Sequence, residues 1–98
     1  MAARLENLSE GKYAVHGNLD FQSVASLWGE SLARFRKQPP LCIDLREVGR
    51  SDSSGVALLV AWLSQARALS QDLQFLNIPV QMQAIIKVAD LDELFPAN

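Results

Sequence analysis

Residues 41–63 read LCIDLREVGRSDSSGVALLVAWL, and this stretch decides the fold. Residues 41–45 form a short, nearly continuous apolar run that is typical of a buried central strand, and Val48 can extend it. The last part predicts a helix from about Ser53 to Leu69. Between the two lies RSDSSG, residues 50–55, with three serines, an aspartate and a glycine. The order is strand, polar loop and helix.

The predicted helix is apolar on nearly all of its faces. One face holds Val56, Leu59, Val60 and Leu63, and another holds Leu58, Trp62, Ala66 and Leu69. A helix that is apolar all round is buried on more than one side. In a small domain, a partner protein can cover the second side.

The sequence before this stretch predicts two strands and a helix. Residues 3–9 and 13–16 suit strands, Gly11 suits a turn between them, and residues 17–18 end the second strand. An amphipathic helix follows, with Asp20 or Ser23 as its cap, and the two prolines at 39–40 end it. Its predicted inward residues are Val24, Leu27, Trp28, Leu32 and Phe35.

The sequence after this stretch predicts a strand at residues 73–77 and a helix that starts at Pro79. The order of elements is therefore β-β-α-β-α-β-α within one domain, residues 1–98. Because helices separate the later strands, we expect an α/β fold with a mostly parallel four-stranded sheet, mixed at its edge, and about three helices. The first two strands can pair as a hairpin or form an edge. The third helix is predicted to point Val80, Ile85, Ile86, Val88 and Ala89 inward, and Leu91, Leu94 and Phe95 continue its apolar surface.

Composition excludes several functional classes. The 98 residues carry a net charge of −2, and the basic residues are scattered, which argues against binding nucleic acid. The first residues lack the apolar segment of a signal peptide, and the longest apolar run has eight residues, too few to span a membrane. We therefore expect a cytoplasmic protein that does not insert into the membrane. Cys42, the one cysteine, lies in an apolar run and cannot form an internal disulfide.

No catalytic or cofactor motif is present in the sequence. The single histidine, His16, lies in a predicted strand, and the sequence has no Gly-x-Ser-x-Gly elbow to activate a serine. It has neither a phosphate-binding glycine loop nor histidines and cysteines at metal-binding spacing. We expect a protein that is not an enzyme and that binds no cofactor or metal.

The serines of residues 50–55 exceed what a helix start needs. Asp52 or Ser53 can accept a hydrogen bond from the first turn, but a capping box would require Glu or Gln where Val56 stands. In an open parallel sheet, a loop between a strand and a helix is also where functional sites lie. A phosphate on Ser53 would meet the helix N-terminus beside the Asp52 carboxylate and add nearly two negative charges.

The chain resembles the STAS domain family over essentially its whole length. The resemblance rests on a strand ending in GNLD (residues 17–20), an amphipathic helix, the strand IDLREV (residues 43–48) and DSSG (residues 52–55) opening an apolar helix. It implies the STAS fold, which is the fold of anti-sigma factor antagonists and of the regulatory tails of sulfate transporters.

Within the family, the chain is most similar to the MlaB branch, in its short length, its Leu27-Trp28 pair and its ending DELFPAN (residues 92–98). This resemblance implies a cytoplasmic subunit that binds an MlaF-like ATPase and, through it, an MlaE-like permease at the inner membrane. Such a complex moves phospholipids between the two membranes and maintains the lipid asymmetry of the outer membrane. Ser53 takes the position of the family's functional hydroxyl.

A second branch remains open because MlaB proteins often carry threonine, then glycine or alanine, where this chain has Ser53-Ser54. That pair is closer to the sporulation-type antagonists, in which a kinase anti-sigma factor phosphorylates the serine matching Ser53. Both branches imply a partner at this loop. The candidate partner-binding residues are Asp52, Ser53, Ser54, Gly55, Val56, Leu59 and Trp62. The last three can equally be core, and Trp62 is the one expected to be exposed.

Overall fold

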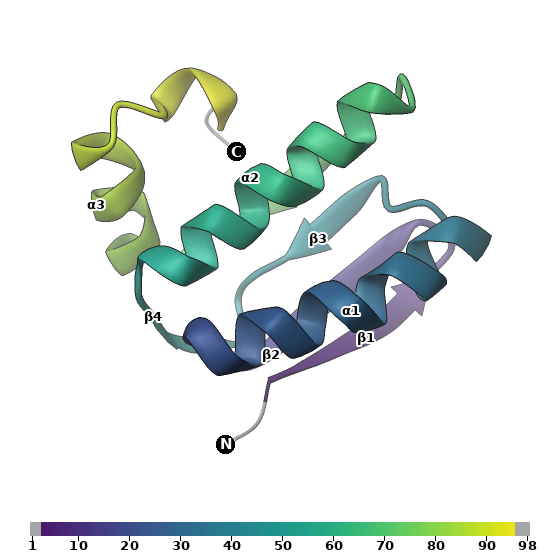
Figure 1. Ribbon diagram of the computed structural model, residues 1–98, viewed down its shortest axis with the longest axis horizontal. Helices are drawn as coiled ribbons and strands as arrows, with labels where there is room; N and C mark the ends of the chain where they lie inside the picture. The colour runs from purple at the N-terminus through teal and green to yellow at the C-terminus, as the bar shows by residue number, and fades with distance from the viewer. Residues whose placement is uncertain (1–2, 96–98) are drawn as a thin grey trace.

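The computed structural model, which describes residues 3–95, has the predicted order of elements with one addition (Figure 1). The strands are β1 (Arg4–Ser9), β2 (Lys12–Leu19), β3 (Cys42–Asp44), β4 (Val48–Ser51) and β5 (Gln74–Leu76). The α-helices are α1 (Phe21–Lys37), α2 (Ser53–Ala68) and α3 (Val80–Val88), followed by a 3-10 turn at Asp92–Leu94.

The sheet is mostly parallel, as the sequence predicts, and its order is β1-β2-β3-β5. The first two strands form an antiparallel hairpin in which Leu5 lies opposite Val15. Strand β2 then pairs in parallel with β3, and β3 pairs in parallel with β5, so that Tyr13, Ile43 and Phe75 lie in one row across the sheet. Crossovers between parallel strands are nearly always right-handed, and both step in the same direction, from β2 to β3 and from β3 to β5. The two crossover helices, α1 and α2, therefore lie on the same side of the sheet.

The fifth strand, β4, corrects the prediction of a four-stranded sheet. Val48 does not extend β3, because the chain turns after Asp44. The Asp44 carboxylate accepts the Arg46 N–H at 2.9 Å, and the Val48 N–H bonds to the Leu45 carbonyl at 3.1 Å. Strand β4 instead pairs in parallel with the end of β2, where Leu19 lies opposite Ser51. The aspartate in the apolar run therefore stabilises a turn.

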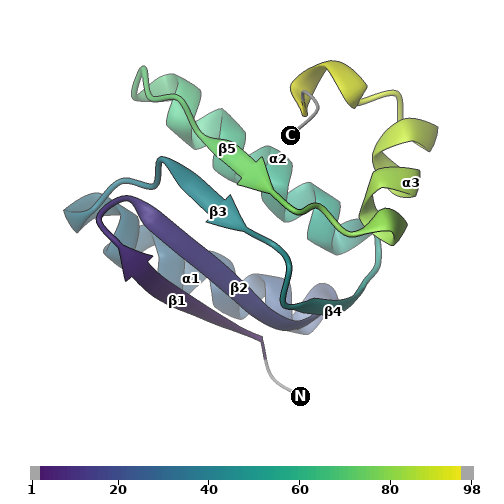
Figure 2. The same ribbon diagram turned by 180° about the vertical axis from the view of Figure 1, so that it is seen from behind.

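Within residues 3–95, helices cover only one face of the sheet. Figure 1 shows α1 and α2 in front of the strands, and Figure 2 shows the opposite face without any helix over it. Alternate strand residues point to the two faces. The residues on the covered face are almost fully buried: Leu5, Tyr13, Val15, Leu19, Ile43, Leu45 and Phe75. Their neighbours in sequence, such as His16, Cys42 and Asp44, are half-buried on the bare face.

Helix α1 confirms its predicted amphipathic pattern and its cap. The Asp20 carboxylate accepts the Ser23 N–H, and the Ser23 hydroxyl accepts the Asp20 N–H, both at 2.9 Å. Leu27 and Phe35 are buried. Val24 and Trp28 pack partly against the core, but Leu32 is 37% exposed.

Helix α3 corrects the predicted inward residues. Met82 and Ile86, one turn apart, are its buried residues, and Ile85 is half-buried. Val80 is 79% exposed and Val88 is 89% exposed, while Ala89 lies just after the helix and is also exposed. A helix of nine residues has room for only a narrow buried stripe, so its apolar residues at both ends face outward. Leu91, Leu94 and Phe95 pack partly against the core, as expected.

Candidate functional site

All three α-helices begin at the same edge of the sheet. Strand β2 leads into α1, β4 leads into α2, and β5 leads toward α3. Figure 1 shows the starts of α1 and α2 near α3 at one end of the molecule. The stretch at residues 50–55 lies here, at the carboxyl ends of the strands, where open α/β sheets place their functional sites.

Asp52 is the N-cap of α2. Its carboxylate accepts the Ser54 N–H at 2.8 Å, and its own N–H donates to the Leu19 carbonyl at 3.2 Å. The first bond satisfies a free donor of the first turn, and the second fixes the helix start to the end of β2. Of the two caps that the sequence allowed, the structure has Asp52.

Ser51 and Gly55 fit together beneath the first turn of α2. The Ser51 hydroxyl donates to the Asp52 carbonyl at 3.0 Å. A methyl group on Gly55 would overlap this hydroxyl and would lie 3.1 Å from the Leu19 Cβ. The close approach of strand and helix therefore requires glycine at position 55. Gly55 is buried and supports the loop, so it is not part of the exposed surface.

The hydroxyl of Ser53 is available to a partner. Ser53 is the first residue of α2 and is exposed, whereas Ser54 is half-buried. Within residues 3–95, neither hydroxyl makes a hydrogen bond, in contrast to Ser51 and Asp52. The side chains of Ser51 and Asp52 thus form hydrogen bonds at the helix start, whereas the hydroxyls of Ser53 and Ser54 form none with the described residues.

Strand β4, which presents the loop, is held from two sides. From α3, the Gln81 amide donates to the Gly49 carbonyl at 2.6 Å and accepts the Ser51 N–H at 3.3 Å. From β2, the Asn18 side chain accepts the Arg50 N–H at 2.8 Å. These contacts between separate elements place the loop on a fixed support.

Three predicted contact residues lie in the core instead. Val56 is 3% exposed, Leu59 is 0% exposed and Trp62 is 1% exposed, so the expectation that Trp62 is exposed is wrong. Helix α2 packs on the sheet and has α1 on one flank and α3 on the other, which leaves little of its apolar surface uncovered. The Trp62 indole N–H donates to the buried Ser31 hydroxyl on α1 at 3.0 Å.

Two exposed apolar residues beside the loop were missed by the sequence reasoning. Phe21 begins α1 and Val80 begins α3, and each is 79% exposed. Phe21 follows the capping residue Asp20, and Val80 precedes Gln81, which bonds to β4. The available signal was an apolar residue at the first position of a helix, which lies outside the buried stripe. We call residues 50–54, Phe21 and Val80 the loop edge.

Two carboxyl groups lie in or beside the loop edge: Asp52 belongs to it, and Asp20 directly precedes Phe21. Hydrogen bonding by the Ser23 N–H is the main cause that lowers the pKa of the Asp20 carboxyl, with a smaller opposing effect of desolvation. Asp20 therefore stays ionised through the neutral range, near the Asp52 cap. These anions suit the positive ends of the helices.

No activated nucleophile is found in the described part of the chain. The His16 imidazole bonds to the Glu6 carboxylate at 2.7 Å on β1, and no base is hydrogen-bonded to Ser53. Within residues 3–95 there is also no cluster of three metal-binding side chains, and none of the described helices has the length and apolar character needed to cross a bilayer.

The fold is similar to that of SpoIIAA. One solved structure, the anti-sigma factor antagonist SpoIIAA in its unphosphorylated form, matches with a TM-score of 0.66 and 23% identity over 88% of this chain and 82% of that chain. The Bacillus cell fate determinant SpoIIAA in its phosphorylated form matches with a TM-score of 0.70 and 20% identity, over 99% and 92%.

A comparison with curated protein sequences found no match. A family model described as "Mlab, STAS domain" matches residues 4–96, which include every strand and helix described above. With the parallel sheet, the one-sided helical layer and the DSSG start of α2 in place, the chain belongs to the STAS family.

Proposed function

We propose that this protein is a non-catalytic subunit that binds the MlaF-like ATPase of an ABC transporter through its loop edge. Through that ATPase it would act with an MlaE-like permease at the inner membrane, in a complex that moves phospholipids and maintains outer-membrane asymmetry. The protein itself would be cytoplasmic, would consist of one domain, and would reach the membrane only through its partner. The description of the matching family model supports this branch.

The observation that carries the proposal is the exposed Ser53 hydroxyl, which has no hydrogen-bond partner among the described residues. This hydroxyl lies on a firmly supported helix start, and exposed Phe21 and Val80 lie on the neighbouring helices. Interfaces commonly combine an aromatic anchor with polar groups that need partners. Asp52 and Ser54 would border the contact, while Gly55, Val56, Leu59 and Trp62 would support it from inside.

The test is affinity purification of the tagged protein from its own cells, with mass spectrometry of the partners and of the peptide that contains Ser53. We expect an ABC ATPase together with a permease, and Ser53 without phosphate. Phe21→Ala should reduce recovery of the ATPase. The matched control is Leu41→Ala, because Leu41 is also exposed, at 60%, but lies at the other end of the sheet. Equal recovery with both variants would argue against the loop edge.

A second candidate is an anti-sigma factor antagonist that a kinase phosphorylates on Ser53. The likeness in fold to both forms of SpoIIAA and the Ser53-Ser54 pair favour it. The same purification separates the candidates. A kinase among the partners and phosphate on Ser53 would replace the transporter proposal.

A further inference from the structure

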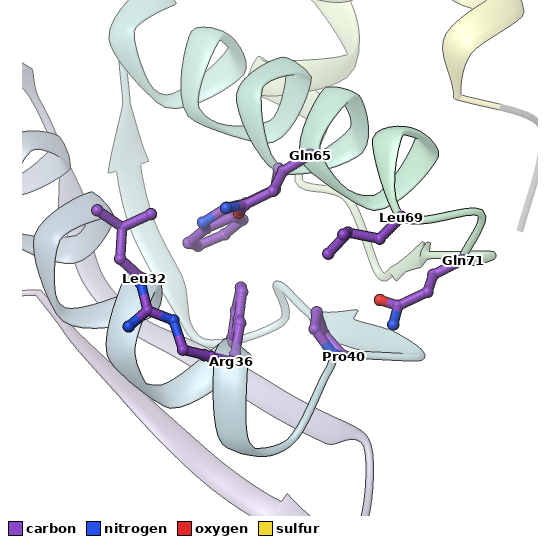
Figure 3. A pocket seen from close by; sticks show the side chains of 8 residues that line it. Leu32, Arg36, Pro40, Gln65, Leu69 and Gln71 are labelled. Carbon is purple, nitrogen blue, oxygen red and sulfur yellow. The ribbon is translucent and has the colours of Figure 1, made fainter.

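A pocket lies between α1 and α2, toward the C-terminal ends of both helices and therefore away from the loop edge. Its volume is about 230 Å³. Figure 1 shows the two helices drawing apart in this direction, and Figure 3 shows side chains from both helices and from the following loops around the space. The pocket shares no residue with the loop edge.

The floor of the pocket is aromatic and rigid. The rings of Phe35 and Trp62 form it, with centroids 5.6 Å apart and planes tilted by 56°. Because the indole N–H of Trp62 is used by Ser31, this ring offers the pocket only apolar surface. Leu69 and Pro40 face each other across one end of the space (Figure 3). An apolar group would be desolvated here on several sides.

The rim of the pocket holds unused polar groups. Arg36, Gln65 and Gln71 line it, and their side chains make no hydrogen bond or ion pair within residues 3–95. Arg34 on the same helix is different, since it is paired with Glu30 at 2.9 Å. The residues one turn before Arg36 are Leu32 and Ala33, so no carboxylate on its own helix neutralises it. The rim thus combines one free positive charge with two amides.

We propose that this pocket binds a small monocarboxylate, with its apolar body on the aromatic floor and its carboxylate at Arg36. An apolar lining with a few polar groups at fixed places is typical of ligand sites. Guanidinium groups bind carboxylates through paired hydrogen bonds.

The test uses straight-chain carboxylates and the full chain labelled with nitrogen-15. Titration with butanoate, hexanoate, octanoate and decanoate is followed by NMR at the Trp62 indole N–H and at the side-chain amides of Gln65 and Gln71. We expect saturable shifts at these groups. Affinity should rise about two- to fourfold for each methylene that the pocket desolvates, and then level off within the series when the pocket is full. A steady rise to decanoate, or shifts centred on residues 50–54, would overturn the proposal.

The role of Arg36 is tested with a neutral ligand and a matched variant. Octanol should bind more weakly than octanoate by about fivefold, as expected for one partly exposed charged contact. Arg36→Gln should remove this difference, and Arg46→Gln, an exposed arginine beyond the far end of β3, should preserve it. Equal binding of octanol and octanoate to the unmodified protein would exclude a carboxylate site, and so would an unchanged preference in Arg36→Gln.

Discussion

Ser53 is the residue at which a role in the fold and the proposed role in partner binding separate most clearly. Its hydroxyl makes no hydrogen bond with the described residues, while its neighbour Asp52 caps α2. A change of its side chain should therefore affect a partner more than the fold. This distinguishes Ser53 from Ser51, whose hydroxyl packs under the helix.

Ser53→Asp should weaken binding of the partner by about tenfold or more, since an unpaired charge would be buried in the interface. The variant should fold normally, because a carboxylate at the first turn of a helix is favourable. Titration of the purified partner measures the first effect, and urea unfolding measures the second. Ser64→Asp is the matched control, as Ser64 is an exposed serine on the same helix. If both variants bind like the parent, the loop edge is not the interface.

Gly55→Ala should destabilise the fold by about 1–3 kcal/mol, the usual range for overpacking. The new methyl group would overlap the Ser51 hydroxyl and approach Leu19. The double variant Ser51→Ala, Gly55→Ala should recover part of this loss, because the nearest atom is then absent. Urea unfolding of the single and double variants gives the coupling between the two sites. Strictly additive effects would show that the two residues do not contact each other.

The sequence was sufficient to predict the polar residues of this loop but not its buried ones. A polar stretch before an apolar run indicates a helix start, so Asp52 and Ser53 could be proposed as caps. The need for Gly55 arises from the approach of Leu19 and Ser51, which depends on the pairing of β4 with β2. No local pattern encodes that approach.

At the scale of elements, α2 is the central support of the molecule. It packs against the sheet, α1 and α3 together, which accounts for an apolar pattern on nearly every face. The sequence indicated burial on more than one side, but it could not say whether the chain or a partner covers the second side. The structure assigns that cover to α1, where the buried Ser31 accepts the Trp62 N–H.

Trp62→Phe should therefore lower the free energy of unfolding by about 1–3 kcal/mol, through loss of a buried hydrogen bond and a gap beside the smaller ring. Phe21→Ala should change it by less than about 0.5 kcal/mol, since Phe21 is 79% exposed. Binding of the partner should be weakened more by Phe21→Ala than by Trp62→Phe. Urea unfolding and titration of both variants check this contrast, and an equally destabilised Phe21→Ala would contradict the assignment of Phe21 to the surface.

The short elements were the hardest to predict. Strand β4 has four residues and only one apolar side chain, Val48, so periodicity gives no signal for it. It forms because the turn after Asp44 redirects the chain toward β2, and because Gln81 and Asn18 bond to its backbone. These are contacts between distant parts of the sequence. For α3, the pattern predicted a helix correctly but placed Val80 and Val88 on the wrong face.

At the scale of the whole molecule, the parallel order of β2, β3 and β5 could be predicted because a helix long enough to cross over precedes both β3 and β5. The uncovered face could not, since right-handed crossovers leave one face bare only when both step in the same direction across the sheet, here from β2 to β3 and from β3 to β5. The pocket between α1 and α2 was also beyond prediction. It depends on how far two helices diverge, which their separate sequences do not specify.

The hydrogen bonds of the Asp44 carboxyl, at the end of β3, make the stability of the fold depend on pH. Burial of the Asp44 carboxyl opposes its ionisation, but hydrogen bonds from Asn77 after β5 and from the Arg46 N–H outweigh this effect and lower its pKa below 3.8. A carboxyl with a lower pKa in the fold than in the unfolded chain stabilises the fold above the unfolded value. This contribution is lost as the pH falls below 3.8 and through the folded value.

Asp44→Asn should thus be less stable than the parent at pH 7, and the difference should narrow between about pH 5 and pH 2. Urea unfolding of both proteins at several pH values measures the difference directly. Other carboxyls, such as Asp20, contribute equally to both proteins and cancel in the comparison. A difference that stays constant with pH would mean that the charge of Asp44 has no part in the stability.

The bare face of the sheet has a practical consequence. Cys42 is the only thiol in the chain, and it is half-buried on this face, because its neighbour Ile43 points to the helices and alternate strand residues point to opposite faces. Its neighbours across the sheet are Lys12 and Gln74. A small thiol-reactive fluorophore or spin label at this position would face away from the helical layer. The native chain therefore carries a single attachment point for optical or magnetic reporters, without any engineered cysteine.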